Sequence, residues 1–310
     1  MGIEFKSLRE QINLLRTRNL SISQEDEPKV KSLLLRSSYY DVVNGYGSFL
    51  QDSTNHFFDG ATFNELYSIY MYDKNIKSVF FRKIEKAESV IRASVSYHFS
   101  RSHKGKWSYL DSNNFKDDPF EVSKLMSKLS GIIEKQKRYK GTTIRHYMDT
   151  HNEVPLWVLV NFIDFGTLKT FFKLMKDTDK IAVVDNINGL YKEHYGILPN
   201  LTPTVFESYL ENINDVRNIV AHDNRLLKFK LRRNAKQNKE ICHPYRNIRL
   251  DSVFHVYLSL KIFLSAGQYK NFTNALRNRT KDLKRDLGKT ESKSDINDIL
   301  YSIGFPKDWV

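Results

Sequence analysis

Apolar residues recur every three or four positions along most of the chain, which is the spacing of an amphipathic helix. Near the start this spacing appears at Leu8, Ile12 and Leu15. Polar residues 23–26 offer a cap before a second helical segment. We therefore predict a helical N-terminal region over residues 1–60, in which the aromatic-rich stretch 38–46 packs against the main body.

Thr62 and Glu65 have the spacing of a capping box, so a helix should begin there. From residue 73 to about residue 100 the apolar spacing predicts the longest helix of the chain. Its apolar stripe consists of Ile76, Phe80, Ile84, Ala87, Ile91 and Val95.

Two charged pairs lie on this predicted longest helix. Glu88 and Arg92 are one turn apart, and we expect them to form an ordinary surface ion pair. Arg92 and His98 form an Arg–His pair that we interpret as structural, because Arg92 already has Glu88 as a partner.

The chain turns polar over residues 104–140, and we predict an insertion there within a helical core that spans residues 61–270. This stretch ends in a basic run that contains Lys135, Lys137 and Arg138. Tyr139 lies within that run, which suits contact with RNA phosphates and bases; a solvated helix face is the other interpretation.

The segment after the polar stretch, residues 155–172, is apolar enough for a pair of core helices, with Trp157 packed inside. Residues 271–310 are expected to form a helical C-terminal tail. The predicted fold class is therefore all-α.

A further helix should start at Thr202 and Pro203, a cap followed by a proline at the first helical position. Its apolar stripe consists of Phe206, Leu210, Ile213, Val216 and Val220. On a helical wheel His222 falls on the polar face, and Arg217 falls near the stripe, roughly 140° away. An ideal helix therefore does not aim both side chains at one atom. Arg217 could reach around, the helix could be distorted, or the two could act in a site shared between protomers.

Composition restricts the partners and the chemistry. A formal charge of +13 and a pI near 9.5 favour a polyanionic partner, for which we expect RNA. The single cysteine, Cys242, excludes an intramolecular disulfide and a multi-cysteine zinc site, and we expect no metal and no cofactor. The longest apolar run, residues 154–163, is too short for a membrane helix, so we expect a cytoplasmic protein with no membrane contact.

The most specific chemistry lies at Arg217, Asn218 and His222. An Arg can hold a phosphate through paired hydrogen bonds, and a His can move protons near neutral pH, so the set suits work on a phosphodiester. The structural alternative is an Arg paired with a carboxylate of a neighbouring helix and a His at a helix end, where its cation meets the helix dipole favourably.

This motif, followed by residues 223–226, resembles the signature of HEPN ribonucleases. The chain as a whole resembles the Abi family of bacterial abortive-infection proteins, of the AbiD and AbiF type. The stretches that carry this likeness are residues 8–15, 39–46, 155–168 and 304–309. The resemblance implies a HEPN-like helical bundle with an N-terminal helical extension, a homodimer, and a role in phage defence.

It further implies a metal-independent endoribonuclease in which the RNA 2′-hydroxyl attacks the adjacent phosphorus. His222 would be general acid or base, Arg217 would bind the scissile phosphate, and Asn218 would orient one of the two. The candidates for holding RNA outside the motif are Lys228, Lys230, Arg232 and Arg233, together with the basic run near residue 138. Two alternatives stay open: a non-cleaving protein that holds a structured small RNA, and a protein-interaction adaptor.

Overall fold

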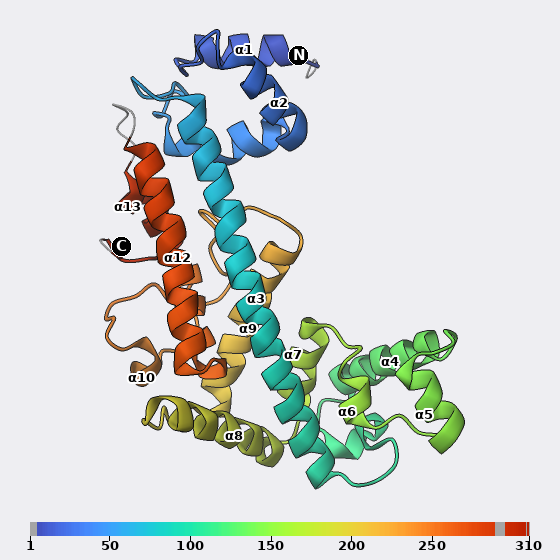
Figure 1. Ribbon diagram of the computed structural model, residues 1–310. Coiled ribbons are helices and arrows are strands. Elements are labelled where there is room, and N and C mark those ends of the chain that lie inside the picture. The colour runs from blue at the N-terminus through green and yellow to red at the C-terminus, as the bar shows by residue number, and fades with distance from the viewer. Residues whose placement is uncertain (1–4, 289–294, 308, 310) are drawn as a thin grey trace. The chain divides into compact units, whose positions relative to one another are not determined.

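The computed structural model describes residues 5–288, 295–307 and 309. These residues form α-helices joined by loops and short 3-10 or π turns (Figure 1). Within the described residues the only β structure is three isolated bridges, which confirms the all-α prediction. In the same residues, no helix combines the length and the apolar character needed to cross a membrane.

The α-helices are α1 (Leu8–Thr17), α2 (Glu27–Ser37), α3 (Phe63–Ser102), α4 (Pro119–Gln136), α5 (Thr143–His151), α6 (Leu156–Leu159), α7 (Phe165–Leu174), α8 (Asp177–Tyr195), α9 (Pro203–Ala221), α10 (Lys239–Cys242), α11 (Val253–Ser259), α12 (Ala266–Leu287) and α13 (Ile296–Ser302). A π turn covers Tyr40–Asn44.

The chain divides into two compact units. The first consists of Met1–Phe80, Ile219–Lys230 and Asn271–Val310, and the second consists of Phe81–Asn218 and Leu231–Lys270. Helices α3, α9 and α12 each supply residues to both units.

In the first unit, α3 begins at the predicted capping box. The Thr62 amide donates to Glu65 Oε2 at 2.9 Å, and the Glu65 amide donates to Thr62 Oγ1 at 3.2 Å. Helix α12 runs alongside the first half of α3 (Figure 1), where the Phe80 and Phe272 rings pack edge to face. The helix predicted to start at this capping box and the longest helix predicted from residue 73 are one continuous helix, α3, of 40 residues.

The core of the second unit is aromatic and aliphatic. The predicted stripe of α3 is buried as expected, with Ile76 and Phe80 in the first unit and the rest in the second. In the second unit, Phe99 of α3 packs against Phe171 of α7, with ring centroids 4.9 Å apart. Phe206 of α9 packs against Phe172. The stripe of α9 is buried from Phe206 to Val216, while Val220 is half-buried.

Three expectations for residues of the second unit need refinement. Glu88 is buried rather than at the surface. Arg92 Nη2 donates to Glu88 Oε1 at 2.5 Å and to the Ile163 carbonyl at 2.9 Å. The polar stretch 104–140 contains α4, an amphipathic helix whose apolar side is buried and packs on α7. The packing prediction for Trp157 is wrong, because this side chain is 57% exposed.

Candidate functional site

The end of α9 differs from the prediction that His222 lies inside the helix. The helix ends at Ala221 and His222 follows it as the capping residue. Asp223 adopts a left-handed φ of 56°, and the Asn224 amide donates to the Ile219 carbonyl at 3.0 Å. This is the geometry of a Schellman motif, in which a left-handed residue turns the chain away from the helix axis. His222 is therefore exposed at the carbonyl end of the helix.

A buried carboxylate on α3 fixes the loop that follows His222. Asp73 accepts hydrogen bonds from the amides of Leu226 and Leu227 at 3.1 and 2.7 Å. It also accepts from the Tyr46 hydroxyl at 2.8 Å. These bonds satisfy buried polar groups that would otherwise destabilise the fold.

A buried lysine one turn further along α3 completes the anchor. Lys77 donates to Asp223 Oδ1 at 2.7 Å and to the carbonyls of Asp223 and Asn224 at 3.2 and 3.1 Å. It also pairs with Asp73 at 3.2 Å. The four acceptors compensate for the desolvation of the ammonium group, and they hold the His222 loop in one position.

His222 opens onto a groove of about 560 Å³ in the first unit. The groove is lined by Tyr40, Asp41, Asn44, Gly45, Tyr46, Tyr70, Lys74, His222, Asp223, Asn224 and Arg225. Within the stretch 38–46, the predicted packing holds for Val42, Val43 and Tyr46, which are buried. It is wrong for Tyr40, which is 71% exposed and presents its ring to the groove.

The charges in the groove are paired but accessible. Lys74 pairs with Asp223 and lies 5.2 Å from the centre of the Tyr70 ring. Burial lowers the pKa of Lys74, but the bond to Asp223 and the Tyr70 hydroxyl outweigh it, so the pKa is raised. Burial raises the pKa of Asp223, but Lys74 and Lys77 outweigh it and the pKa is lowered. Arg225 donates to the Gly45 carbonyl, and its side chain is otherwise open to the groove.

Arg217 and Asn218 lie near the end of α9 and belong to the second unit. Arg217 is half-buried, and it makes no ion pair or side-chain hydrogen bond with the residues that the structure describes. Its charge acts on Glu88, whose pKa is raised because burial outweighs the effects of Arg92 and Arg217. The structural alternative of a direct Arg217–carboxylate pair is thus not realised among the described residues.

Of the basic residues predicted to bind RNA after the motif, some contact other protein groups and others face solvent. Lys228 donates to Ser48 Oγ at 2.6 Å and lies over the Phe49 ring, and burial, together with Arg225, lowers its pKa. Lys230 is exposed. In the second unit, Arg233 pairs with Glu211 at 2.6 Å, and Arg232 lies 3.9 Å from Asp215.

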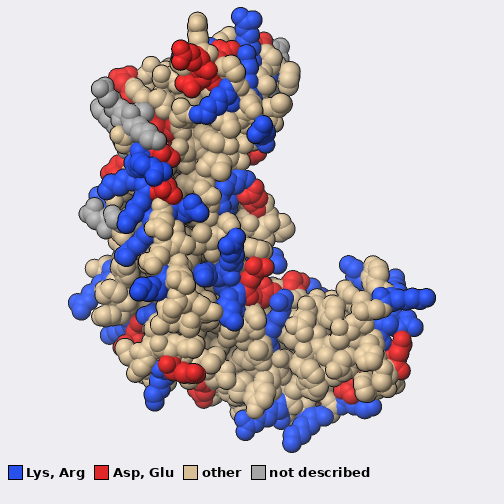
Figure 2. All heavy atoms as spheres, in the orientation of Figure 1, with Lys and Arg blue, Asp and Glu red and all other residues tan. Residues whose placement is uncertain are grey.

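The basic run near residue 138 lies at the end of α4. Lys and Arg side chains gather at the tip where α4 leads into α5 (Figure 2). Lys135 and Arg138 are exposed, and Lys137 pairs with Glu134 at 2.5 Å. Tyr139 is exposed beside them. Both the RNA-binding interpretation and the solvated-face interpretation are compatible with this exposure.

Metal ligands do not gather in the part of the chain that the structure describes: no group of three or more His, Cys, Asp or Glu could hold an ion there. Cys242 is buried, and burial raises the pKa of its thiol.

Comparison with known families gives a match to the Abi-like proteins over residues 32–228, which is more than half of the chain. The chain belongs to the Abi-like protein family. Membership supports a role in abortive infection, a form of defence against phage. No curated protein and no solved structure matched the chain significantly.

The matched region of this Abi-like protein includes Arg217, Asn218, His222 and all residues of the groove. Residues 8–15 and 304–309, which contributed to the sequence resemblance, lie outside it, and Asp308 lies outside the described residues.

The sequence pattern does not indicate the residues that anchor His222, Asp73 and Lys77, or the groove residues Tyr40 and Lys74. Asp73 and Lys77 are four apart on a helix, which is the spacing of any surface ion pair. Their partners lie about 150 positions later in the chain, so no local pattern points to them. A Tyr40 ring directed toward solvent has no local signal either.

Proposed function

We propose that this Abi-like protein is a metal-independent endoribonuclease of the HEPN type, related to the AbiD and AbiF proteins, that acts on RNA during abortive infection. The observation that carries the proposal is the exposed His222, which the buried Asp73 and Lys77 hold at the edge of a groove. A catalytic acid or base needs this combination of a fixed backbone and an accessible imidazole.

In the proposed reaction, the 2′-hydroxyl of the RNA attacks the adjacent phosphorus. The bond to the 5′-oxygen of the next nucleotide breaks, which leaves a 2′,3′-cyclic phosphate and a 5′-hydroxyl. His222 removes the proton of the 2′-hydroxyl or supplies one to the departing oxygen. Arg217 binds the phosphate and offsets the charge that develops on it, and Asn218 orients the imidazole or the phosphate.

The groove beside His222 suits a nucleotide. The guanidinium group of Arg225 and the ammonium group of Lys74 can contact phosphate oxygens, since both side chains line the groove, where Arg225 is exposed and Lys74 is partly exposed. The exposed ring of Tyr40 offers a face on which a base can stack. Arg217 acts on Glu88 only through its charge and makes no ion pair or side-chain hydrogen bond with the described residues, which supports its role as a phosphate ligand.

The reaction needs one proton acceptor and one proton donor, and each chain supplies one His222. We therefore propose a homodimer in which two α9 ends contribute to one site.

Outside the groove, we propose that exposed basic side chains hold the RNA backbone. The set consists of Lys135, Lys137, Arg138, Lys228, Lys230, Arg232 and Arg233. Lys228 and Arg233 already have protein partners, so Lys135, Arg138 and Lys230 are expected to contribute most.

The test is cleavage of unstructured and structured RNAs in EDTA by the wild type, His222→Ala and Arg217→Ala. The proposal predicts cleavage by the wild type alone. Cleavage that requires added magnesium, or that survives His222→Ala, would contradict it. An uncleaving wild type that still binds RNA with strong salt dependence would favour the alternative, a protein that holds a structured small RNA.

A further inference from the structure

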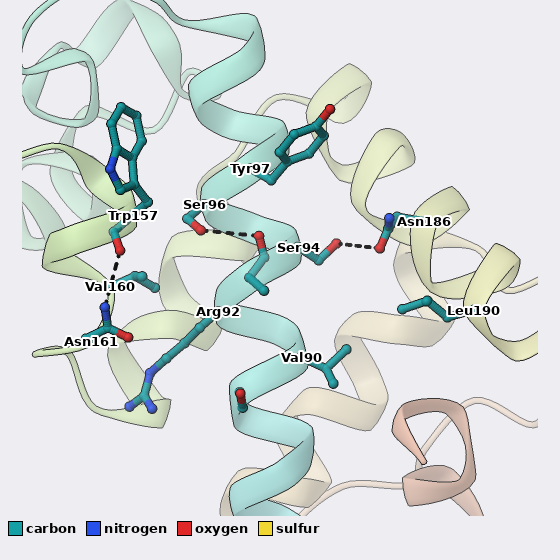
Figure 3. Close-up of a pocket in the computed structure, with 12 residues that line it drawn as sticks. Val90, Arg92, Ser94, Ser96, Tyr97, Trp157, Val160, Asn161, Asn186 and Leu190 are labelled. Atoms are coloured by element: carbon teal, nitrogen blue, oxygen red, sulfur yellow. Dashed lines mark hydrogen bonds between the residues drawn. The ribbon is translucent and has the colours of Figure 1, made fainter. Parts of the chain in front are cut away.

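Another cavity lies in the second unit and does not include His222. It has a volume of about 810 Å³, within the usual range for small-ligand sites. Residues of α3 form its floor, with Trp157 and Asn161 on one side and Asn186 and Leu190 of α8 on the other (Figure 3).

Two aromatic side chains are exposed at this cavity. Trp157 of α6 is 57% exposed, and Tyr97 of α3 is 61% exposed. Large aromatic side chains remain in water at an energetic cost, and exposed aromatic rings at the rim of a pocket are typical of a binding site. Both rings stand at the cavity (Figure 3), where a flat ligand can stack on either.

The polar groups of the cavity are side-chain amides and one guanidinium group. Asn161 uses its Nδ2 to bond the carbonyls of Trp157 and Val158, so its Oδ1 has no partner among the described residues. Asn186 accepts a bond from Ser94 at 3.4 Å, and its Nδ2 is likewise unpartnered within the described chain. Together the two amides offer one free acceptor and one free donor, and such groups can hydrogen-bond to the edge of a nucleobase.

Arg92 also lines the cavity, and protein groups hold its guanidinium group. Its Nη2 donates to Glu88 Oε1 at 2.5 Å and to the Ile163 carbonyl at 2.9 Å.

The charge of the cavity distinguishes a base from a phosphate. Arg92 is the single charged residue in the lining, and Glu88 neutralises it. A phosphate would find little net positive charge there, whereas an uncharged heterocycle finds two stacking faces and free amides.

We propose that this cavity binds an unpaired nucleobase of the RNA, with Trp157 and Tyr97 as the stacking faces and Asn161 and Asn186 at the base edge. The inference rests on the proposed function only in requiring that the protein binds RNA. It assigns single-stranded rather than fully paired RNA as the bound form.

The test measures the affinity of His222→Ala, chosen so that RNA is not cut, for three fluorescent probes. These are a short unstructured RNA, a fully paired duplex of the same sequence, and the same single strand with its bases removed. We expect the unstructured RNA to bind most tightly. Trp157→Ala and Tyr97→Ala should each weaken its binding about tenfold, the size of one lost stacking contact, and should leave binding of the base-free strand unchanged.

Phe120→Ala is the matched control, because Phe120 is an equally exposed aromatic residue of the second unit outside the cavity. Circular dichroism checks the fold of each variant. If Trp157→Ala does not fold, Tyr97→Ala on a different helix provides the same comparison.

Wild-type affinity of both cavity variants would overturn the inference and leave the proposed ribonuclease untouched. A change in oligomeric state on size-exclusion chromatography, without a change in RNA affinity, would also overturn it and would identify the cavity as a protein contact. A protein that neither binds nor cleaves any RNA would instead contradict the proposed function itself.

Discussion

Asp73 and Lys77 are the residues on which the position of His222 depends most. Both are buried on α3, and together they bind the backbone of the loop from Asp223 to Leu227. Neither touches the groove directly, so we expect them to act as positioning residues.

Lys77→Met tests this role. Removal of one partner leaves Asp73 with an uncompensated buried charge, so unfolding in urea should show a loss of about 3 kcal/mol. Lys74→Met is the control, because Lys74 is a partly exposed neighbour and its loss should lower stability by less than about 1 kcal/mol. Equal losses of stability for the two substitutions would contradict the role of Lys77 as an anchor of the loop after His222.

His255 predicts a pH dependence of stability. It is fully buried in α11, and burial lowers its pKa to about 4. In the unfolded chain the pKa of His255 is about 6.5. Between pH 6.5 and pH 4 the unfolded chain therefore binds a proton at His255 that the folded chain does not bind. Stability should therefore fall as the pH drops from about 6.5 to 4, by roughly 3 kcal/mol, and this loss should level off below pH 4.

The measurement is urea unfolding of the wild type and His255→Gln across this range. The variant should lose this part of the pH dependence. Exposed His151 is the control, and His151→Gln should follow the wild-type curve. A wild-type stability that does not change between pH 6.5 and 4 would rule out a buried neutral His255.

At the level of elements, the sequence predicts the features that depend on the local spacing of apolar residues and on helix caps. The start of α3, the buried stripes of α3 and α9, and the start of α9 follow from spacing and caps. The end of α9 does not, because Asp223 enters the left-handed region through contacts with a lysine on a distant helix. Trp157 is missed for a related reason, since its apolar neighbours predict burial while the short α6 turns it outward.

The tip between α4 and α5 carries a prediction of its own. If Lys135, Lys137 and Arg138 contact RNA phosphates, replacing all three with Gln should make the slope of log affinity against log salt concentration less steep. The slope should change by at most about 2. The control is Lys124→Gln on the same helix, where Lys124 already pairs with Glu121. An unchanged slope would show that these three side chains form a solvated helix face and do not contact RNA phosphates.

At the level of the whole molecule, the two compact units divide the motif. Arg217 and Asn218 belong to the second unit and His222 to the first, although one helix carries the chain from one to the other. Secondary structure was predictable from the sequence because it depends on local spacing. This division was not, because it depends on contacts between segments such as Ile219–Lys230 and the start of α3.

The proposed dimer predicts that one missing His222 inactivates the shared site. A mixed dimer of wild type and His222→Ala retains one His222, which can serve as the proton acceptor or as the proton donor but not as both. Mixed dimers of verified composition should therefore cleave RNA far less than the half of wild-type activity that two independent sites would give. Half of wild-type activity in such dimers would place both residues in a site formed by one chain.

The central claim is that His222 and the RNA 2′-hydroxyl carry out cleavage without a metal. The most direct measurement identifies the product ends after cleavage in EDTA, beside a substrate with one 2′-deoxy nucleotide at the cut position. We predict 2′,3′-cyclic phosphate and 5′-hydroxyl ends, and no cleavage at the deoxy position. Cleavage at the deoxy position, or a 5′-phosphate end, would contradict the account.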